Sequence, residues 1–220
     1  MLTPWAHKPT PFYKDYQLAR ANYFLGGMEM ISTLDRLLVN HCGATLVGVK
    51  AACLVSCCRV PREQVADSVA AYNRALNRSG LLFRIYHNRA GCPLLFVYRP
   101  ALLWNRLRSS EAAPILAQAG YSIGLKDCLD RLGDRLAAGE EFPHEIGLFL
   151  DYPPDDVAGY LLHGGRDCKA CGYWKVYSDV DRANRLFRLY DACREALCAQ
   201  LDKGLALVEL LATQPAPALS

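Results

Sequence analysis

The feature that most constrains the fold is a pair of apolar runs that flank a short polar loop. Residues 81–87 read LLFRIYH, residues 92–99 read CPLLFVYR, and the loop between them contains Asn88 and Gly91. Runs rich in branched and aromatic residues around such a loop predict a β-hairpin. Pro93 has no N–H group to donate, which places the beginning of the second run at a strand end or a sheet edge.

Most of the remaining chain has apolar residues three or four positions apart, the spacing of amphipathic helices. We predict helices at residues 16–40, 44–58, 61–80, 110–119, 125–138, 144–150 and 154–164, and a long helix from the capping residues Ser178 and Asp179 to Leu201. Gly48 disfavours the second of these, and a strand is the alternative for residues 144–150. Trp174 to Tyr177 could form a short third strand. The predicted fold class is α+β, a mostly helical single domain with a β-hairpin.

The length and composition fit one globular domain. The chain has 220 residues, of which 52% are hydrophobic and 21% are charged, and this is enough to bury a substantial core. We expect an N-terminal arm and helix at residues 1–36 and the main domain at 37–204. A helix end and a disordered tail are expected at 205–220.

Charge and hydropathy limit the partners. The 25 basic and 22 acidic residues give a net charge of +3 and are interspersed, so they form no electrostatic footprint for nucleic acid or an anionic membrane. The first residues do not read as a secretory signal, and no apolar run approaches the roughly 18 residues that span a bilayer. We expect a cytoplasmic protein with no nucleic-acid or membrane partner, and leave a small-molecule or protein partner open.

The chain contains ten cysteines, which is many for its length. In a reducing compartment, free thiols, metal ligands or a reactive thiol are expected before disulfides. Cys53, Cys92 and Cys128 lie inside apolar or periodic segments, where a free cysteine packs like a small hydrophobic residue.

The second half of the chain holds the greatest density of reactive side chains, including His144 and the Cys168-x-x-Cys171 pair. Cysteines at this spacing can reach one metal ion from a single turn. Cys193 and the cysteine five positions later are about 140° apart around a helix, so both cannot face that ion. A metal site would instead combine the first pair, or one member of it, with Cys193 and with Cys42 or His144. The alternative is a chance spacing in a cysteine-rich chain.

Cys42 also fits the role of a nucleophile. It would stand just before the helix predicted at 44–58, where unpaired N–H groups and the helix dipole stabilise a thiolate. His144, in the first turn of its own predicted helix, would stay neutral and could act as a base. Papain-like hydrolases show the same order of Cys and His. Ordinary structural roles for both residues are the alternative.

Three segments resemble a known bacterial family, domain of unknown function 3793. They are HCGATLVGVK at 41–50, FPHEIGLFLDYPPDDVAGY at 142–160 and CGYWKVYSDV at 171–180, and the likeness extends over residues 37–204. The family has no characterised function. The resemblance implies which residues are candidates for a functional site, because the family pattern has the same residue types there. They are Cys42, Lys50, His144, Glu145, Cys168 and Cys193, with Cys171 matching less regularly.

The chain also departs from the family pattern. Ala44 stands where the family often has Pro, and Asp151 where it often has Gly. The additional thiols lie outside the pattern, which favours packing roles for Cys53, Cys57, Cys58 and Cys198.

The leading hypothesis is a metal or iron–sulfur centre on Cys42, Cys168 and Cys193. Cys171, His144 or an exogenous ligand would complete it, and zinc is the alternative to a cluster. Such a centre could support redox or lyase and hydrolase chemistry. The second hypothesis is a metal-free thiol enzyme, a papain-like hydrolase or a transferase, with Cys42 as nucleophile and His144 as base. Glu145 and Lys50 are further catalytic candidates. The third hypothesis is a non-enzymatic interaction protein.

Overall fold

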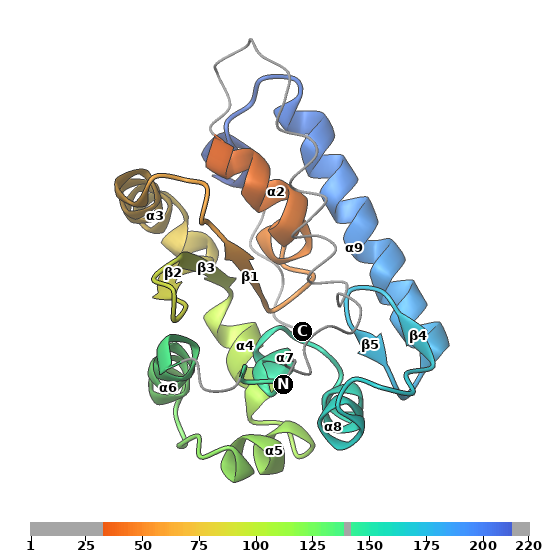
Figure 1. Ribbon diagram of the computed structural model, residues 1–220. Coiled ribbons are helices and arrows are strands. Elements are labelled where there is room, and N and C mark those ends of the chain that lie inside the picture. The colour runs from red at the N-terminus through yellow and green to blue at the C-terminus, as the bar shows by residue number, and fades with distance from the viewer. Residues whose placement is uncertain (1–32, 139–141, 213–220) are drawn as a thin grey trace, which may run out of the picture.

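The structure is a computed structural model that describes residues 33–138 and 142–212 (Figure 1). The predicted N-terminal arm, the first part of the helix predicted at 16–40 and the last residues of the predicted tail lie outside the described residues.

A three-stranded antiparallel sheet forms the middle layer. The predicted hairpin is confirmed as β2 (Leu82–His87) and β3 (Pro93–Tyr98), with Phe83 opposite Val97. Strand β1 (Ala52–Ser56) pairs with the other side of β3, so the strand order is β1-β3-β2. The α+β fold class is confirmed.

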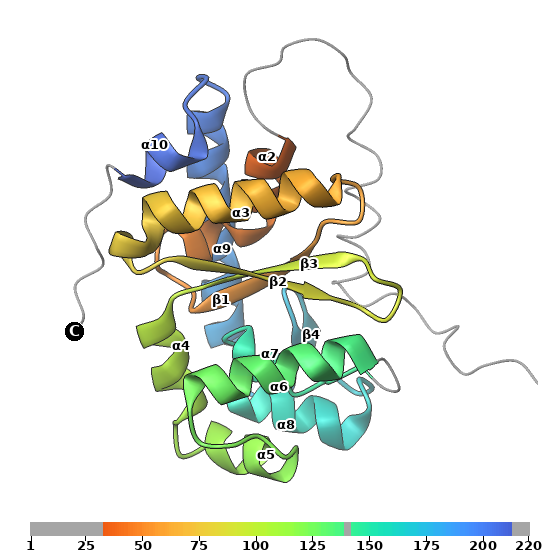
Figure 2. The ribbon, with the colours of Figure 1, turned by 90° about the vertical axis from the view of Figure 1, so that its left-hand side faces the viewer.

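Helices cover both faces of this sheet (Figure 2). One face packs against α2 (Thr33–Leu46), α3 (Arg62–Leu76), α9 (Val180–Leu201) and α10 (Leu207–Ala212). The other face packs against α4 (Pro100–Leu107), α5 (Ala112–Gln118), α6 (Leu125–Ala138), α7 (Ile146–Phe149) and α8 (Pro154–His163). A short 3-10 helix, η1 (Asn77–Ser79), follows α3. Alternate residues of β3 enter the two cores, since Leu95 and Val97 lie in the first and Phe96 in the second.

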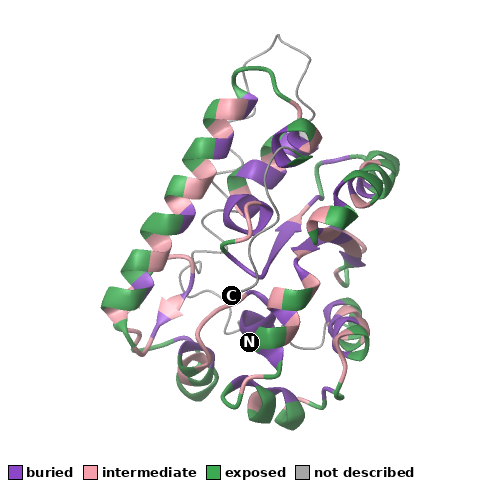
Figure 3. Cartoon of the chain, turned by 180° about the vertical axis from the view of Figure 1, so that it is seen from behind, coloured by how far each residue is buried: buried purple, intermediate pink, exposed green. Residues whose placement is uncertain are grey.

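A second, two-stranded hairpin packs against α9. It consists of β4 (Ala170–Cys171) and β5 (Lys175–Val176), which confirms the short strand predicted near Trp174 and adds its partner. Trp174 and Val176 form a third core with Ala183 and Tyr190 of α9. Exposed residues lie along the outward side of this helix (Figure 3).

Asp156, in the first turn of α8, anchors the second hairpin. Its buried carboxylate accepts hydrogen bonds from the Trp174 indole at 2.7 Å, and from the Tyr177 N–H, Ser178 N–H and Ser178 hydroxyl groups at 2.8 Å each. Four donors on one carboxylate fix the hairpin to α8.

The predicted helix at 44–58 is wrong. Helix α2 continues through Cys42 to Leu46, the chain turns, and β1 begins at Ala52. Gly48 has a φ of 83° and ends the helical run. The strand is buried on both faces, and a continuous apolar run of this kind cannot be told from a buried helix by its spacing.

The other helices predicted within the described residues are present as α3, α5, α6, α7, α8 and α9, and α9 begins at the predicted cap Asp179. Helix α4 was missed. None of the helices in the described residues is long and apolar enough to cross a membrane.

Cys58 and Cys92 form a disulfide, with 5.1 Å between their Cα atoms. Both were predicted as packing residues, and this is a correction. The first follows β1 and the second precedes β3, so the antiparallel pairing of these strands brings the two cysteines together.

Candidate functional site

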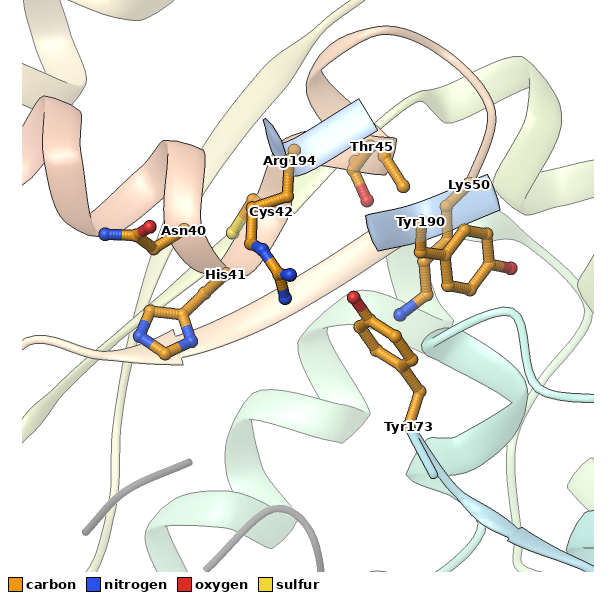
Figure 4. A pocket seen from close by; sticks show the side chains of 10 residues that line it. Asn40, His41, Cys42, Thr45, Lys50, Tyr173, Tyr190 and Arg194 are labelled. Atoms are coloured by element: carbon orange, nitrogen blue, oxygen red, sulfur yellow. The ribbon is translucent and has the colours of Figure 1, made fainter. Parts of the chain in front are cut away.

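The candidate site is a small pocket where the C-terminal half of α2, the turn after it, α9 and the second hairpin meet (Figure 4). Its cavity volume for a water-sized sphere is about 10 Å³, room for about one water molecule. The residues that line it are Asn40, His41, Cys42, Gly43, Ala44, Thr45, Lys50, Tyr173, Tyr190 and Arg194. The walls of the pocket therefore come from three segments that are far apart in the sequence.

Cys42 and Cys53 form a pair of neighbouring thiols at this pocket, and Cys42 is part of its lining. Cys42 lies on α2 and is 1% exposed, and Cys53 lies at the beginning of β1 and is also buried. In its protonated form, Cys53 can donate to the His41 carbonyl oxygen, 3.1 Å from its sulfur. The turn between α2 and β1 folds the second cysteine back beside the first.

The surroundings shift the pKa values of the two thiols in opposite directions. A hydrogen bond from Cys42 to the Cys53 thiolate and the nearby charge of Lys50 lower the pKa of Cys53 to about 7, although burial opposes this. Burial and the neighbouring Cys53 sulfur raise the pKa of Cys42 well above its usual value. The thiol pair therefore releases one proton near neutral pH and keeps the other.

Lys50 brings a buried positive charge to the pocket. The residue is 6% exposed, and its amino group lies 5.2 Å from the ring centre of Tyr152 and 5.4 Å from that of Tyr190. Within the described part of the chain it forms no ion pair with a carboxylate. The faces of the two rings stabilise the cation, and no carboxylate of the described residues neutralises its charge.

Thr45 adds a second buried polar group. The residue is 0% exposed, and its hydroxyl oxygen has no hydrogen-bond partner among the described residues. The backbone around it is fixed, because the Arg99 guanidinium group donates to the carbonyl oxygens of Thr45 at 2.9 Å and Leu46 at 2.6 Å. These bonds satisfy carbonyl groups at the C-terminus of α2.

The rim of the pocket carries Arg194 and Tyr173. Asp191 accepts a hydrogen bond from the Tyr173 hydroxyl at 2.9 Å and pairs with Arg194 at 2.9 Å. A Cβ atom at Gly43 would lie 3.0 Å from the Cα atom of Arg194, so α2 and α9 are in close contact here. Figure 4 shows the ends of Lys50, Tyr173 and Arg194 directed toward the pocket.

The structure does not assemble the predicted metal centre. Residues 33–138 and 142–212 contain no group of three or more His, Cys, Asp or Glu side chains that could hold a metal ion. Cys42 contacts the first core, Cys193 packs at the third core, and Cys168 and Cys171 lie near Tyr177. Cys42, Cys168 and Cys193 therefore lie in different surroundings, and no ligand set forms from them.

The predicted partner of Cys42 also lies elsewhere. His144 stands in the turn before α7, with its ring centre 4.9 Å from that of Tyr160 and 5.7 Å from that of Phe142. It is not among the described residues that line the pocket. Cys42 is in the C-terminal half of α2 rather than before a helix, so the helix dipole does not stabilise a thiolate there.

Glu145 is part of a buried network on the far side of the sheet. Its carboxylate pairs with the Arg135 guanidinium group at 2.8 Å and accepts a hydrogen bond from the Tyr121 hydroxyl at 2.9 Å. The side chain does not line the pocket. Its contacts are those of a residue that holds α6 and the chain before α7 together.

Sequence reasoning missed Cys53, Thr45, Tyr173, Tyr190 and Arg194 as site residues. Only Gly48 signalled the turn that brings Cys53 to Cys42. Tyr190 and Arg194 are four positions apart and so share one face of α9, but their spacing did not indicate which surface they meet. Of the predicted site residues, the structure brings only Cys42 and Lys50 to one pocket.

Comparison with known proteins agrees with the resemblance. The model of a family described as "Protein of unknown function (DUF3793)" matches residues 38–211. No curated protein and no solved structure was found to match the chain. Because the family model covers most of the chain, including every residue of the pocket, the chain belongs to the DUF3793 family.

Proposed function

We propose that this protein is a thiol-dependent enzyme in which the Cys42–Cys53 pair supplies the nucleophile and Lys50 stabilises it. The observation that carries the proposal is the juxtaposition of two buried thiols and a buried lysine beside one pocket. A thiolate is the reactive form of cysteine, and a neighbouring hydrogen-bond donor and cation favour it.

Each member of the pair has a distinct role in this proposal. Near neutral pH Cys53 carries the thiolate and Cys42 keeps its proton. Transfer of that proton from Cys42 to Cys53 within the pair would place the thiolate on Cys42, which lines the pocket. Lys50 supplies the positive charge that a histidine supplies in Cys–His enzymes. This role replaces His144 as the group that activates Cys42.

The proposed chemical step is a nucleophilic displacement at carbon. The Cys42 thiolate forms a bond to an electrophilic carbon of the substrate, and the bond from that carbon to its leaving group breaks. The leaving group takes the electron pair and accepts the proton that Cys53 holds. A second nucleophile then takes the carbon group from Cys42, whose sulfur leaves with the electron pair, and gives its own proton to Cys53. The reaction is a transfer or, with water, a hydrolysis.

Alkylation with neutral iodoacetamide at pH 7.5, mapped by peptide mass spectrometry, tests the proposal. The chain offers two internal references, the exposed Cys171 and the buried Cys128, whose pKa is raised by burial. We expect the thiol pair to react about ten times faster than Cys128, which is similarly buried, because more thiolate is present. Only one alkyl group should be added to the pair, since the remaining thiol stays protonated.

Two variants complete this test. Cys42→Ala should abolish the rapid reaction, whereas Cys128→Ala, which removes a buried thiol outside the pocket, should leave the rate at the pair unchanged. Thermal unfolding of each variant shows whether it is folded. A thiol pair that reacts no faster than Cys128 in the folded wild-type protein would overturn the proposal.

A further inference from the structure

The pocket has more positive charge and more unsatisfied hydrogen-bonding capacity than the described residues use. Burying a charged or polar group without a partner is unfavourable, and a ligand that supplies the partner removes this unfavourable free energy. Lys50 has no acidic partner, and the fully buried Thr45 hydroxyl group has no hydrogen-bond partner in the described residues. Both residues line the same pocket.

The acidic groups near the pocket have partners of their own. Asp191 is shared by Arg194 and Tyr173 at the rim. Asp151 pairs with Arg106 at 2.8 Å and accepts a hydrogen bond from the Ala51 N–H group at 2.9 Å. No carboxylate in the described residues is left for Lys50.

The other charged groups near the pocket do not neutralise Lys50 either. Glu195 lies 3.6 Å from Arg194 but is 74% exposed, where solvent screens its charge. Among the described residues near the pocket, the remaining acidic group is the thiol pair, which is negative in its reactive form and neutral otherwise. With the thiols protonated, the pocket therefore carries a net positive charge.

From this arrangement we infer that the pocket binds one oxyanion group, a carboxylate or a phosphoryl group, of an anionic substrate. Lys50 would pair with the anion, and the Thr45 hydroxyl and the Arg194 guanidinium group would donate hydrogen bonds to its oxygens. The cavity has room for about one water molecule, so one oxygen atom of the group would occupy it and the rest of the group would lie at the rim beside Arg194. The inference rests on the proposed thiol enzyme and names the class of its substrate.

Protection of the thiol pair tests the inference. The iodoacetamide rate at the pair, divided by the rate at Cys171, is measured in rising concentrations of phosphate or acetate, with chloride at equal ionic strength as the control. We expect saturable slowing of at least fivefold by one of the two oxyanions, and the comparison between them identifies which group the pocket takes. Slowing by neither, beyond that in chloride, would overturn the inference.

Lys50→Met keeps the apolar stem of the side chain and removes its charge, so it should abolish the protection. Thr45→Val keeps the shape and removes only the hydroxyl group, so it should weaken the protection severalfold while the protein remains folded. Should Lys50→Met fail to fold, Thr45→Val decides alone, and unchanged protection in that variant would contradict the assigned role of its hydroxyl group.

A readout independent of thiol chemistry separates this inference from the proposed function. A ligand that binds only the folded state raises the unfolding temperature, so phosphate or acetate should stabilise the wild-type protein more than Thr45→Val. Stabilisation with slow thiols would contradict the enzyme proposal alone. Fast thiols with neither stabilisation nor protection would contradict the oxyanion site alone.

Discussion

Thr45 and Lys50 are buried polar residues that lack a hydrogen-bond partner and a carboxylate partner, respectively, within the described ranges of the chain. Thr45 is fully buried and its hydroxyl oxygen has no hydrogen-bond partner in the described chain. A buried hydroxyl group of this kind lowers stability, because its hydrogen bonds to water are lost on folding. Residues that oppose stability are expected where a site is built to receive a ligand.

The substitution Thr45→Val should therefore stabilise the free protein. We expect the free energy of unfolding to increase by about 1 kcal/mol, because valine has the same shape without the unsatisfied group. Thr45→Ser is the matched control, since it keeps the hydroxyl group and loses a methyl group, and it should lower stability by about 1 kcal/mol. Urea denaturation measures both, and a loss of stability in Thr45→Val would show that the hydroxyl group is satisfied.

A second prediction concerns the hydrogen bond within the thiol pair. Cys42 lowers the pKa of Cys53 by donating to its thiolate. In Cys42→Ser the hydroxyl group can still donate, so the pH midpoint of alkylation at Cys53 should stay near 7. In Cys42→Ala the donor is lost and the midpoint should move upward. Equal midpoints in the two variants would mean that the hydrogen bond does not set the acidity.

The sequence pointed to Cys42 and Lys50 but not to Cys53, for a physical reason. The helix predicted at 44–58 would place residue 53 about 14 Å along its axis from residue 44, at 1.5 Å per residue, and so far from Cys42, which stands just before that helix. The turn after Leu46 replaces that separation by direct contact of the side chains. Because the helix predicted at 44–58 is wrong, the sequence did not indicate that Cys53 lies beside Cys42.

Among the elements, the second hairpin forms one wall of the pocket and is held in place by one carboxylate. Asp156 accepts hydrogen bonds from three residues of the segment Trp174–Ser178. Tyr173, at the turn of this hairpin, lines the pocket. The geometry of the pocket should therefore depend on a residue that does not touch it.

Asp156→Ala should lower the free energy of unfolding by about 3 kcal/mol, because several buried donors lose their acceptor. Asp156→Asn is the matched control: its remaining carbonyl oxygen can still accept from Tyr177 and Ser178, so the loss should be about half as large. Denaturant unfolding gives the two values. Equal losses would show that the charge of Asp156, rather than its number of hydrogen bonds, holds the hairpin.

Elements whose signals are local were predicted well. The β2–β3 hairpin, α3 between Pro61 and Gly80, and the cap of α9 at Asp179 all depend on residues that are neighbours in the chain. Strand β1 was not predicted, because it is defined by its pairing with β3, some forty residues later. Its buried apolar run carries no alternation that separates a strand from a helix.

For the whole molecule, the Cys58–Cys92 disulfide joins the loop before α3 to the beginning of the central strand. The two cysteines are 34 positions apart, and closing a loop of this length restricts the unfolded chain. Reduction should therefore lower the free energy of unfolding by about 2 to 4 kcal/mol. The double variant Cys58→Ser, Cys92→Ser should be insensitive to the reductant. Equal stability of the oxidised and reduced wild-type protein would contradict this role.

The site itself could not be derived from the sequence, because it exists only where three distant segments meet. Residues 40–50, Tyr173 and the α9 residues Tyr190 and Arg194 are brought together by the packing of α9 on α2 and on the second hairpin. In the described residues this packing brings no group of three metal-binding side chains together, so Cys42, Cys168 and Cys193 do not form the centre that the sequence had suggested. The family resemblance identified Cys42 and Lys50 as site residues, and only the tertiary structure shows which other residues line the pocket.

The most direct test of the account is the pH dependence of iodoacetamide alkylation at the thiol pair of the wild-type protein. A folded-state pKa lowered to about 7 means that the rate should rise with pH through a midpoint near 7 and level off well below pH 9. Lys50→Met should move this midpoint upward, because the cation that favours the thiolate is removed. A rate at the pair that follows the midpoint of an ordinary cysteine, near 8.5, would contradict the central claim that these residues form a reactive thiol site.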